Sequence, residues 1–200
     1  MKKIPLILGL VLILALSACS SSTSKPEKEP KKENYTFKVE EATAIITNDK
    51  SLVGSDAIET KDGMKVEVVP TSLHYEFKLE RNGSSKLFKN TTDKMELKIV
   101  PDQELINASK KAVGFNLFNT DDSDLYGSGQ GISDFNSEGK GILDFTYILG
   151  ADVNSEEIPK LPNKDKLNEL KENALKGTLI VLKNDQEIAR FDLKSINKID

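Results

Sequence analysis

The sequence contains little of the chemistry on which most enzymes and metal sites depend. Its 200 residues include one cysteine, one histidine and no tryptophan. A single cysteine excludes an internal disulfide and a multi-cysteine zinc site. Every Ser-His-Asp arrangement would have to use His74, and no serine lies in a Gly-x-Ser-x-Gly motif. The sequence therefore disfavours hydrolysis by a serine triad.

Positive charge is also limited. The chain carries 28 lysines and arginines against 32 aspartates and glutamates, which gives a formal net charge of −4. Only Arg81 and Arg190 are arginines, and they are far apart in the sequence. Because nucleic-acid-binding domains carry a basic patch or stripe, we expect no nucleic-acid partner.

Long apolar runs are absent except at the N-terminus. Lys2 and Lys3 precede the apolar run Ile4–Leu16, which ends in the small residues Ser17 and Ala18. This order of charged, apolar and small residues is typical of a secretory signal. The run is shorter than the roughly 20 residues that span a bilayer. We therefore predict a cleaved signal peptide over residues 1–18 rather than a retained membrane span.

The residues Leu16-Ser17-Ala18-Cys19 close this signal. They resemble the lipobox of bacterial lipoproteins, which has an aliphatic residue, two small residues and a cysteine. The resemblance covers the first 19 residues and implies cleavage between Ala18 and Cys19, with a diacylglyceryl thioether on the cysteine. Since one acyl chain anchors a protein only marginally and two anchor it stably, the resemblance implies a protein held on the extracytoplasmic face of the cell membrane through its lipid.

A polar segment separates this cysteine from the rest of the chain. Ser20–Asn34 has no aliphatic or aromatic residue and contains two prolines among alternating charges. Such a composition cannot bury enough apolar surface to offset the entropy of ordering. We expect residues 19–34 to form a lipidated cysteine with a disordered tether, and residues 35–200 to form a single domain.

Alternating hydrophobicity predicts strands in this domain. Leu73–Leu79 alternates apolar and polar residues and runs into Asn82-Gly83, a strong hairpin signal. The register of such a hairpin would place Phe77 opposite Phe88. A second hairpin is predicted between 178–183 and 187–193, with residues 184–186 as the turn.

Further strands and two helices complete the expected fold. Strands are predicted over 35–47, with a break near residues 40 and 41, and over 64–69, 95–100, 113–118 and 142–149. A helix is predicted over 164–176 between the N-cap Asn163 and the stop signal Gly177, and a shorter one over 102–112. The pattern indicates a mainly β fold, an antiparallel β-sandwich with one helix from the C-terminal half packed on it. An immunoglobulin-like arrangement is one alternative, although no cysteine pair or tryptophan supports it.

The lone histidine is the first candidate for a functional residue. The alternation places His74 on the polar face of its strand, close to Glu76. Imidazole is a common general base and metal ligand, but a base needs positioned partners. We expect a solvated His74 and assign no catalytic residue.

An acidic loop is the best candidate for a metal site. Asp121, Asp122 and Asp124 supply the carboxylate oxygens that Ca²⁺ prefers. An EF-hand loop beginning at Asp122 would need glutamate at its twelfth position, where the sequence has Ser133. Two alternatives remain, a calcium site of another kind and a solvated acidic loop. No other cofactor is expected.

Two classes of function remain after these exclusions. We prefer a membrane-anchored lipoprotein whose β-sandwich is not catalytic and binds an envelope protein, a glycan or a small ligand, or serves as an accessory subunit. The alternative is an envelope hydrolase, calcium-assisted, that uses acids such as Asp121, Asp124 or Asp144. That alternative needs two carboxylates facing each other across a cleft.

Overall fold

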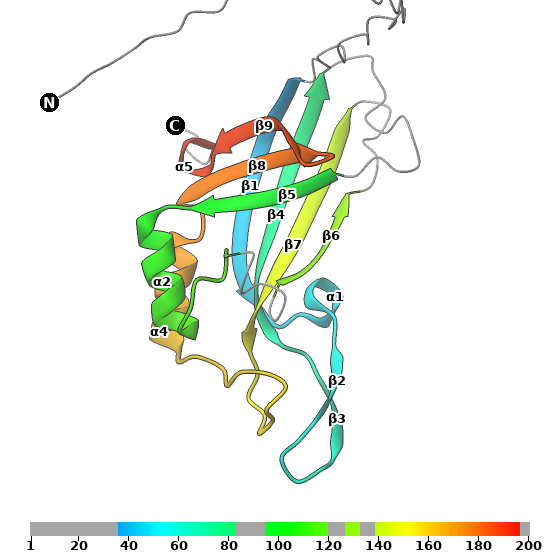
Figure 1. Ribbon diagram of the computed structural model, residues 1–200, viewed down its shortest axis with the longest axis vertical. Helices are drawn as coiled ribbons and strands as arrows, with labels where there is room; N and C mark the ends of the chain where they lie inside the picture. Colours follow the sequence, from blue (N-terminus) through cyan, green and yellow to red (C-terminus); the bar gives the residue numbers. More distant parts are fainter. Residues whose placement is uncertain (1–35, 83–94, 120–126, 133–138, 197–200) are drawn as a thin grey trace, which may run out of the picture. The chain divides into compact units, whose positions relative to one another are not determined.

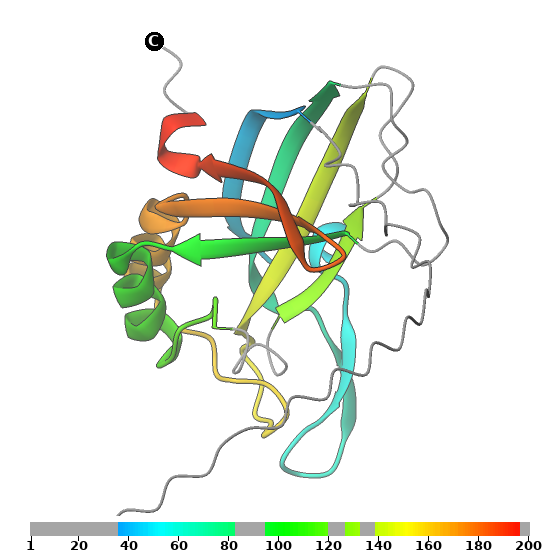
Figure 2. The ribbon, with the colours of Figure 1, turned by 45° about the horizontal axis from the view of Figure 1, so that its top comes forward.

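Two antiparallel sheets make up most of the computed structural model, which describes residues 36–82, 95–119, 127–132 and 139–196 (Figure 1). The larger sheet has the order β1-β4-β7-β6, with β1 (Thr36–Thr47), β4 (Thr71–Asn82), β7 (Lys140–Gly150) and β6 (Gly127–Ile132). The smaller sheet has the order β5-β8-β9, with β5 (Met95–Pro101), β8 (Gly177–Lys183) and β9 (Gln186–Asp192). Its strands cross over one face of the larger sheet (Figure 2). The expected mainly β, sandwich-like fold is confirmed, while the immunoglobulin-like alternative is not.

The main core lies between this inner face of the larger sheet, the smaller sheet and two helices. The side chains that alternate along β4 and β7 supply its centre, as predicted, because every second residue of a strand points to the same face. The fully buried members from these two strands are Leu73, Tyr75, Phe77, Leu79, Leu143 and Leu149. Rings of Tyr75, Phe77 and Phe145 stack with centroids 5.2 to 6.0 Å apart.

The first predicted hairpin is wrong. Phe77 pairs with Ala42 on β1 and with Leu143 on β7, so both sides of this position are occupied. Phe88, its predicted partner, lies outside the described residues. The Asn-Gly signal is local, whereas the pairing of β4 is decided by two strands from distant parts of the sequence.

The second predicted hairpin is confirmed. The connection between β8 and β9 consists of Asn184 and Asp185, both with positive φ, at 50° and 63°. These residue types tolerate the left-handed conformation that a two-residue hairpin turn requires. Gln186 begins β9 instead of completing the turn. The predicted break in the first strand is also confirmed, as a bulge between Val39 and Glu41.

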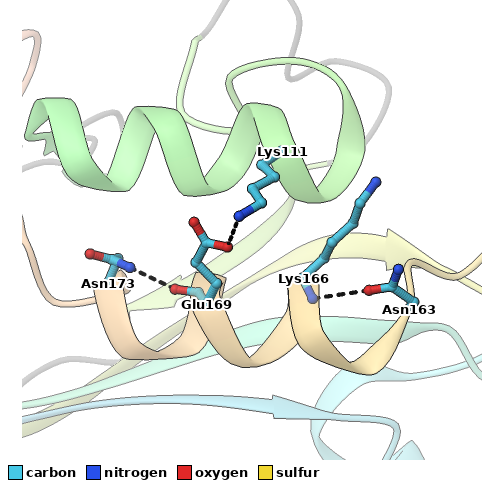
Figure 3. Close-up of polar contacts among 5 residues, drawn as sticks. All are labelled: Lys111, Asn163, Lys166, Glu169 and Asn173. Carbon is cyan, nitrogen blue, oxygen red and sulfur yellow. Dashed lines mark hydrogen bonds and ion pairs between the residues drawn. The ribbon is translucent and has the colours of Figure 1, made fainter.

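Two helices pack against each other beside the sheets (Figure 1). α2 spans Gln103–Val113, and α4 spans Lys164–Asn173. Figure 3 shows the ion pair that joins Lys111 of α2 to Glu169 of α4. Both predicted helices are therefore confirmed, the shorter one included.

The ends of α4 show which sequence signals act. The side chain of Asn163 accepts a hydrogen bond of 3.1 Å from the backbone N–H of Lys166, as predicted for an N-cap (Figure 3). The helix ends at Asn173, before the predicted stop. Gly177 instead begins β8, where a Cβ atom would lie 2.8 Å from the backbone oxygen of Val100. This glycine therefore serves the close approach of β8 to β5.

The strand predicted over 113–118 is wrong. Gly114, at φ 94°, ends α2, and the chain then turns. The Ser109 hydroxyl donates a 2.9 Å hydrogen bond to the backbone oxygen of Phe115 and accepts a 2.8 Å one from the N–H of Leu117. Leu117 and Phe118 are buried in the main core. The alternating pattern therefore comes from a turn that is anchored in the core, not from a strand.

A smaller lobe lies at one end of the larger sheet (Figure 1). It contains the hairpin of β2 (Asp56–Glu59) and β3 (Lys65–Val68), and a second apolar cluster of Ile58, Ala151 and Ile158. The short helix α1 (Lys50–Val53) contacts β4, and the last helix, α5 (Leu193–Ile196), follows β9. None of the helices in the described part of the chain is long and apolar enough to span a membrane.

Candidate functional site

His74 is buried, so the prediction that it is solvated is wrong. Only 4% of its surface is exposed, and its Nδ1 lies 3.2 Å from the hydroxyl oxygen of Thr146 on β7. In the sheet it lies between Ile45 of β1 and Thr146. The alternation did place it on the face opposite the main core, but that face is covered at this end of the sheet, where Ser72 and Thr146 are buried as well.

Among the described residues, the side chains around His74 are those of a buried polar contact. Ser72, two residues earlier on the same face, is fully buried, and its hydroxyl has no hydrogen-bond partner among the described residues. A general base has to reach both a nucleophile and a substrate, and His74 is buried with only a threonine hydroxyl in contact with its ring nitrogen. The observed contact is one that satisfies a buried polar side chain.

Of the three acids considered for hydrolysis, only Asp144 lies in the described part of the chain. It lies beside a second carboxylate. It is directly opposite Glu76 in the register of β4 and β7, and both side chains are half-buried. Directly opposed residues have Cβ atoms about 4.5 to 5.5 Å apart. The two carboxylates lie side by side on adjacent strands and project from the same face of the sheet, instead of facing each other across a cleft.

A shallow depression lies in the smaller lobe. It has a volume of about 500 Å³ and is lined by Glu59, Thr60, Lys61, Glu156 and Glu157. The depression joins the end of β2 to a loop almost 100 residues later in the chain. Its lining is polar and mainly acidic, which suits a cationic ligand better than an apolar one.

Hydrogen bonds fix the two walls of this depression. The backbone N–H of Glu59 donates to Oε2 of Glu157 over 3.2 Å, and the Ser155 hydroxyl donates to the backbone oxygen of Glu59 over 2.6 Å. Nζ of Lys61 lies 3.5 Å from Oε1 of Glu156. Two of its three carboxylates are therefore engaged within the protein. Among the described residues, no group of three His, Cys, Asp or Glu side chains is arranged to hold a metal ion.

The perturbed pKa values belong to structural contacts. The hydrogen bond from Lys50, with a second one from Ser55, lowers the pKa of Glu67 on β3. Burial raises the pKa of Tyr75 well above its usual value, and burial also raises that of Tyr147. Perturbed groups mark an active site when they converge on a cleft, and these groups do not.

The remaining residues singled out by the sequence lie outside the described part of the chain. They are Ala18 and Cys19 of the lipobox and the three loop aspartates Asp121, Asp122 and Asp124. The calcium prediction therefore stays a prediction. Sequence reasoning missed the depression and the Glu76–Asp144 pair, because both are formed by residues far apart in the chain and no local pattern marks them.

Comparison with known proteins adds no assignment. No protein family, curated protein or solved structure matches this chain.

Proposed function

We propose that this protein is an exported bacterial lipoprotein, anchored through a lipid on Cys19, and that its sandwich domain is a non-catalytic binding or accessory module. The observation that carries the proposal is the lipobox-like Leu16-Ser17-Ala18-Cys19 at the end of a signal-like apolar run. A polar tether of residues 20–34 would then hold the domain away from the membrane surface. The partner is an envelope protein, a glycan or a small ligand.

Three features of the domain support a binding or accessory role over catalysis. The one histidine is buried against Thr146. The depression near Glu59 is shallow, and two of its carboxylates are engaged with the protein's own groups. The fold is a sandwich of two sheets, an architecture in which binding surfaces form on exposed faces and loops.

Fractionation of cells that produce the full-length protein tests the anchor. The parent protein and the control Ser21→Ala are expected in the membrane fraction, extractable by detergent but not by high salt. Cys19→Ala is expected to leave that fraction, because no thiol remains to carry the lipid. If Cys19→Ala stays membrane-bound like the control, the lipid anchor on Cys19 is wrong.

A further inference from the structure

The outer face of the larger sheet, opposite the main core, carries an ordered pattern of charge. In the register of β1, β4 and β7, Glu80 lies between Lys38 and Lys140. Two residues earlier on β4, Lys78 lies next to Glu41, with its Nζ 2.5 Å from Oε2 of that glutamate. Opposite charges on adjacent strands stabilise a sheet. In these two rows each charged β4 residue has an oppositely charged neighbour.

The next row breaks this pattern. Glu76 lies between Thr43 of β1 and Asp144 of β7, so two carboxylates are directly opposite each other. Like charges in this position destabilise a sheet. The nearest cation on the same strand, Lys78, is bound to Glu41. The described residues supply no ion pair to either Glu76 or Asp144, and Lys78 adds only a coulombic attraction to Glu76, so this row of the face carries excess negative charge.

Exposed apolar side chains lie on either side of the row that contains Glu76 and Asp144. Ile142 lies two residues before Asp144 on β7 and is 55% exposed. Ile45 lies two residues after Thr43 on β1 and is 38% exposed. Residues two apart on a strand share a face, so both isoleucines lie on the face that carries the two carboxylates. Carboxylates beside exposed apolar side chains offer a partner of opposite charge both an electrostatic contact and apolar surface to bury.

We propose that Thr43, Ile45, Glu76, Ile142 and Asp144, named here the outer patch, bind a partner protein through an arginine or lysine set between apolar side chains. The cation would lie against Glu76 and Asp144, and its apolar neighbours would cover the isoleucines. Arginine fits best, because its planar guanidinium donates to carboxylates in a bidentate manner. The proposal rests on the proposed function in one respect: it identifies the chemistry of the partner of the binding module.

Charge argues against a second copy of this chain as the occupant. A two-fold axis through the outer patch would place this patch against itself and bring the carboxylate pairs of both copies together. A partner that carries positive charge gains from the attraction and removes the repulsion within the pair. The outer patch therefore selects a different protein, and its electrostatic part would weaken as salt rises.

Site-specific photo-crosslinking of the full-length protein in its native cells tests the patch. A photoreactive amino acid replaces Ile142, and the control carries it at Met64, which is 57% exposed on the smaller lobe. We expect an adduct at position 142 and not at position 64. Glu76→Gln with Asp144→Asn should reduce that adduct about tenfold or more, because the partner's charge loses its counter-charges. The matched control, Glu59→Gln with Glu156→Gln, removes two carboxylates elsewhere and should leave the adduct unchanged.

The peptide joined to position 142 decides the chemistry. Mass spectrometry should find an arginine or lysine with apolar neighbours in that peptide. No adduct, equal adducts at 142 and 64, an adduct insensitive to the Glu76 and Asp144 substitutions, or a peptide from this chain itself would overturn the proposal. A thermal melt of each variant shows that it is folded. Membrane fractionation of the same cells reports the anchor separately, so a soluble protein that still forms the adduct would contradict the proposed anchor and leave the patch standing.

Discussion

At the scale of single residues, Tyr75 connects the larger sheet to the helical layer. It is fully buried, and its hydroxyl donates a 2.8 Å hydrogen bond to the backbone oxygen of Ala174, directly after α4. Burial raises the pKa of this phenol well above its ordinary value of 10, so the hydroxyl keeps its proton. The end of α4 therefore has a donor from β4 that does not change with pH near neutrality.

Replacing Tyr75 with phenylalanine should lower the free energy of unfolding by about 1 kcal/mol. The ring still fills its site, but the buried carbonyl of Ala174 loses its donor. Urea unfolding followed by circular dichroism measures the change. Tyr147→Phe is the control, because Tyr147 belongs to the same group of packed rings and no described residue forms a hydrogen bond with its hydroxyl. Equal losses in the two variants would show that the bond to Ala174 contributes nothing.

Glu76 is expected to be destabilising where it stands. Glu76→Gln should raise the free energy of unfolding by about 0.2 to 1 kcal/mol at neutral pH, because it removes a like-charge pair across two strands. The gain should disappear when the same substitution is made in an Asp144→Asn protein, since a double-mutant cycle isolates the pairwise interaction. A gain that persists in the Asp144→Asn background would have another origin.

The sequence predicts the face of a residue better than its burial. The alternation in β4 correctly placed Leu73 and Phe77 in the core, and it correctly placed His74 on the other face. It did not predict that His74 is buried. Period-two alternation reports which side of a sheet a residue occupies, whereas cover on that side is decided by other parts of the chain.

At the scale of elements, caps and turns decide where helices and hairpins begin. The Asn163 cap satisfies an N–H group of the first turn of α4, and this helix packs against both α2 and the core. Asn163→Ala should lower the free energy of unfolding by about 1 kcal/mol, and Asn163→Asp should largely retain it, because aspartate keeps the acceptor oxygen. Chemical unfolding of both variants measures this. Equal destabilisation by alanine and aspartate would contradict a role as a cap.

The contact between α1 and β3 should respond to acid. Lys50 and Ser55 donate to Glu67 and lower the pKa of its carboxyl below the ordinary value of 4.5. A lowered folded pKa gives a stabilisation that is present above the unfolded pKa and is lost as pH falls through the folded one. Glu67→Gln should therefore be slightly less stable than the parent at pH 7, and the difference should shrink below about pH 4.

Unfolding curves at neutral and acidic pH provide this comparison, and a difference that grows in acid would contradict the assignment. The effect should be small, because both side chains of the Lys50–Glu67 pair are more than half exposed.

Local signals explain which elements were predicted and which were not. Asn184-Asp185 and Asn163 act within a few residues of themselves, so they were recognised. Asn82-Gly83 carries an equally strong local signal, yet the sides of β4 are taken by β1 and β7. Residues 113–118 alternate like a strand, but Leu117 and Phe118 are core contacts made from a turn. Tertiary packing overrides local patterns at these positions.

At the scale of the whole molecule, the fold class followed from the sequence and the candidate surfaces did not. Short alternating segments and turn residues indicated an antiparallel β fold. The outer patch joins residues of β1, β4 and β7 through their register, and the depression brings Glu59 beside Glu157. Strand register and long-range contacts are properties of the folded chain, so no local sequence motif predicts either surface. The lipid anchor, in contrast to these two surfaces, is inferred from a local motif of four consecutive residues.

Intact mass measurement of the mature protein, purified from membranes in detergent, shows whether Cys19 carries a lipid. We expect a chain that begins at Cys19, without residues 1–18, and that carries the added mass of a diacylglyceryl group on this first residue. A fragment spectrum should place all of that mass on Cys19. A protein that retains residues 1–18, or one that begins elsewhere with an unmodified Cys19, would show that Cys19 is not the lipid anchor.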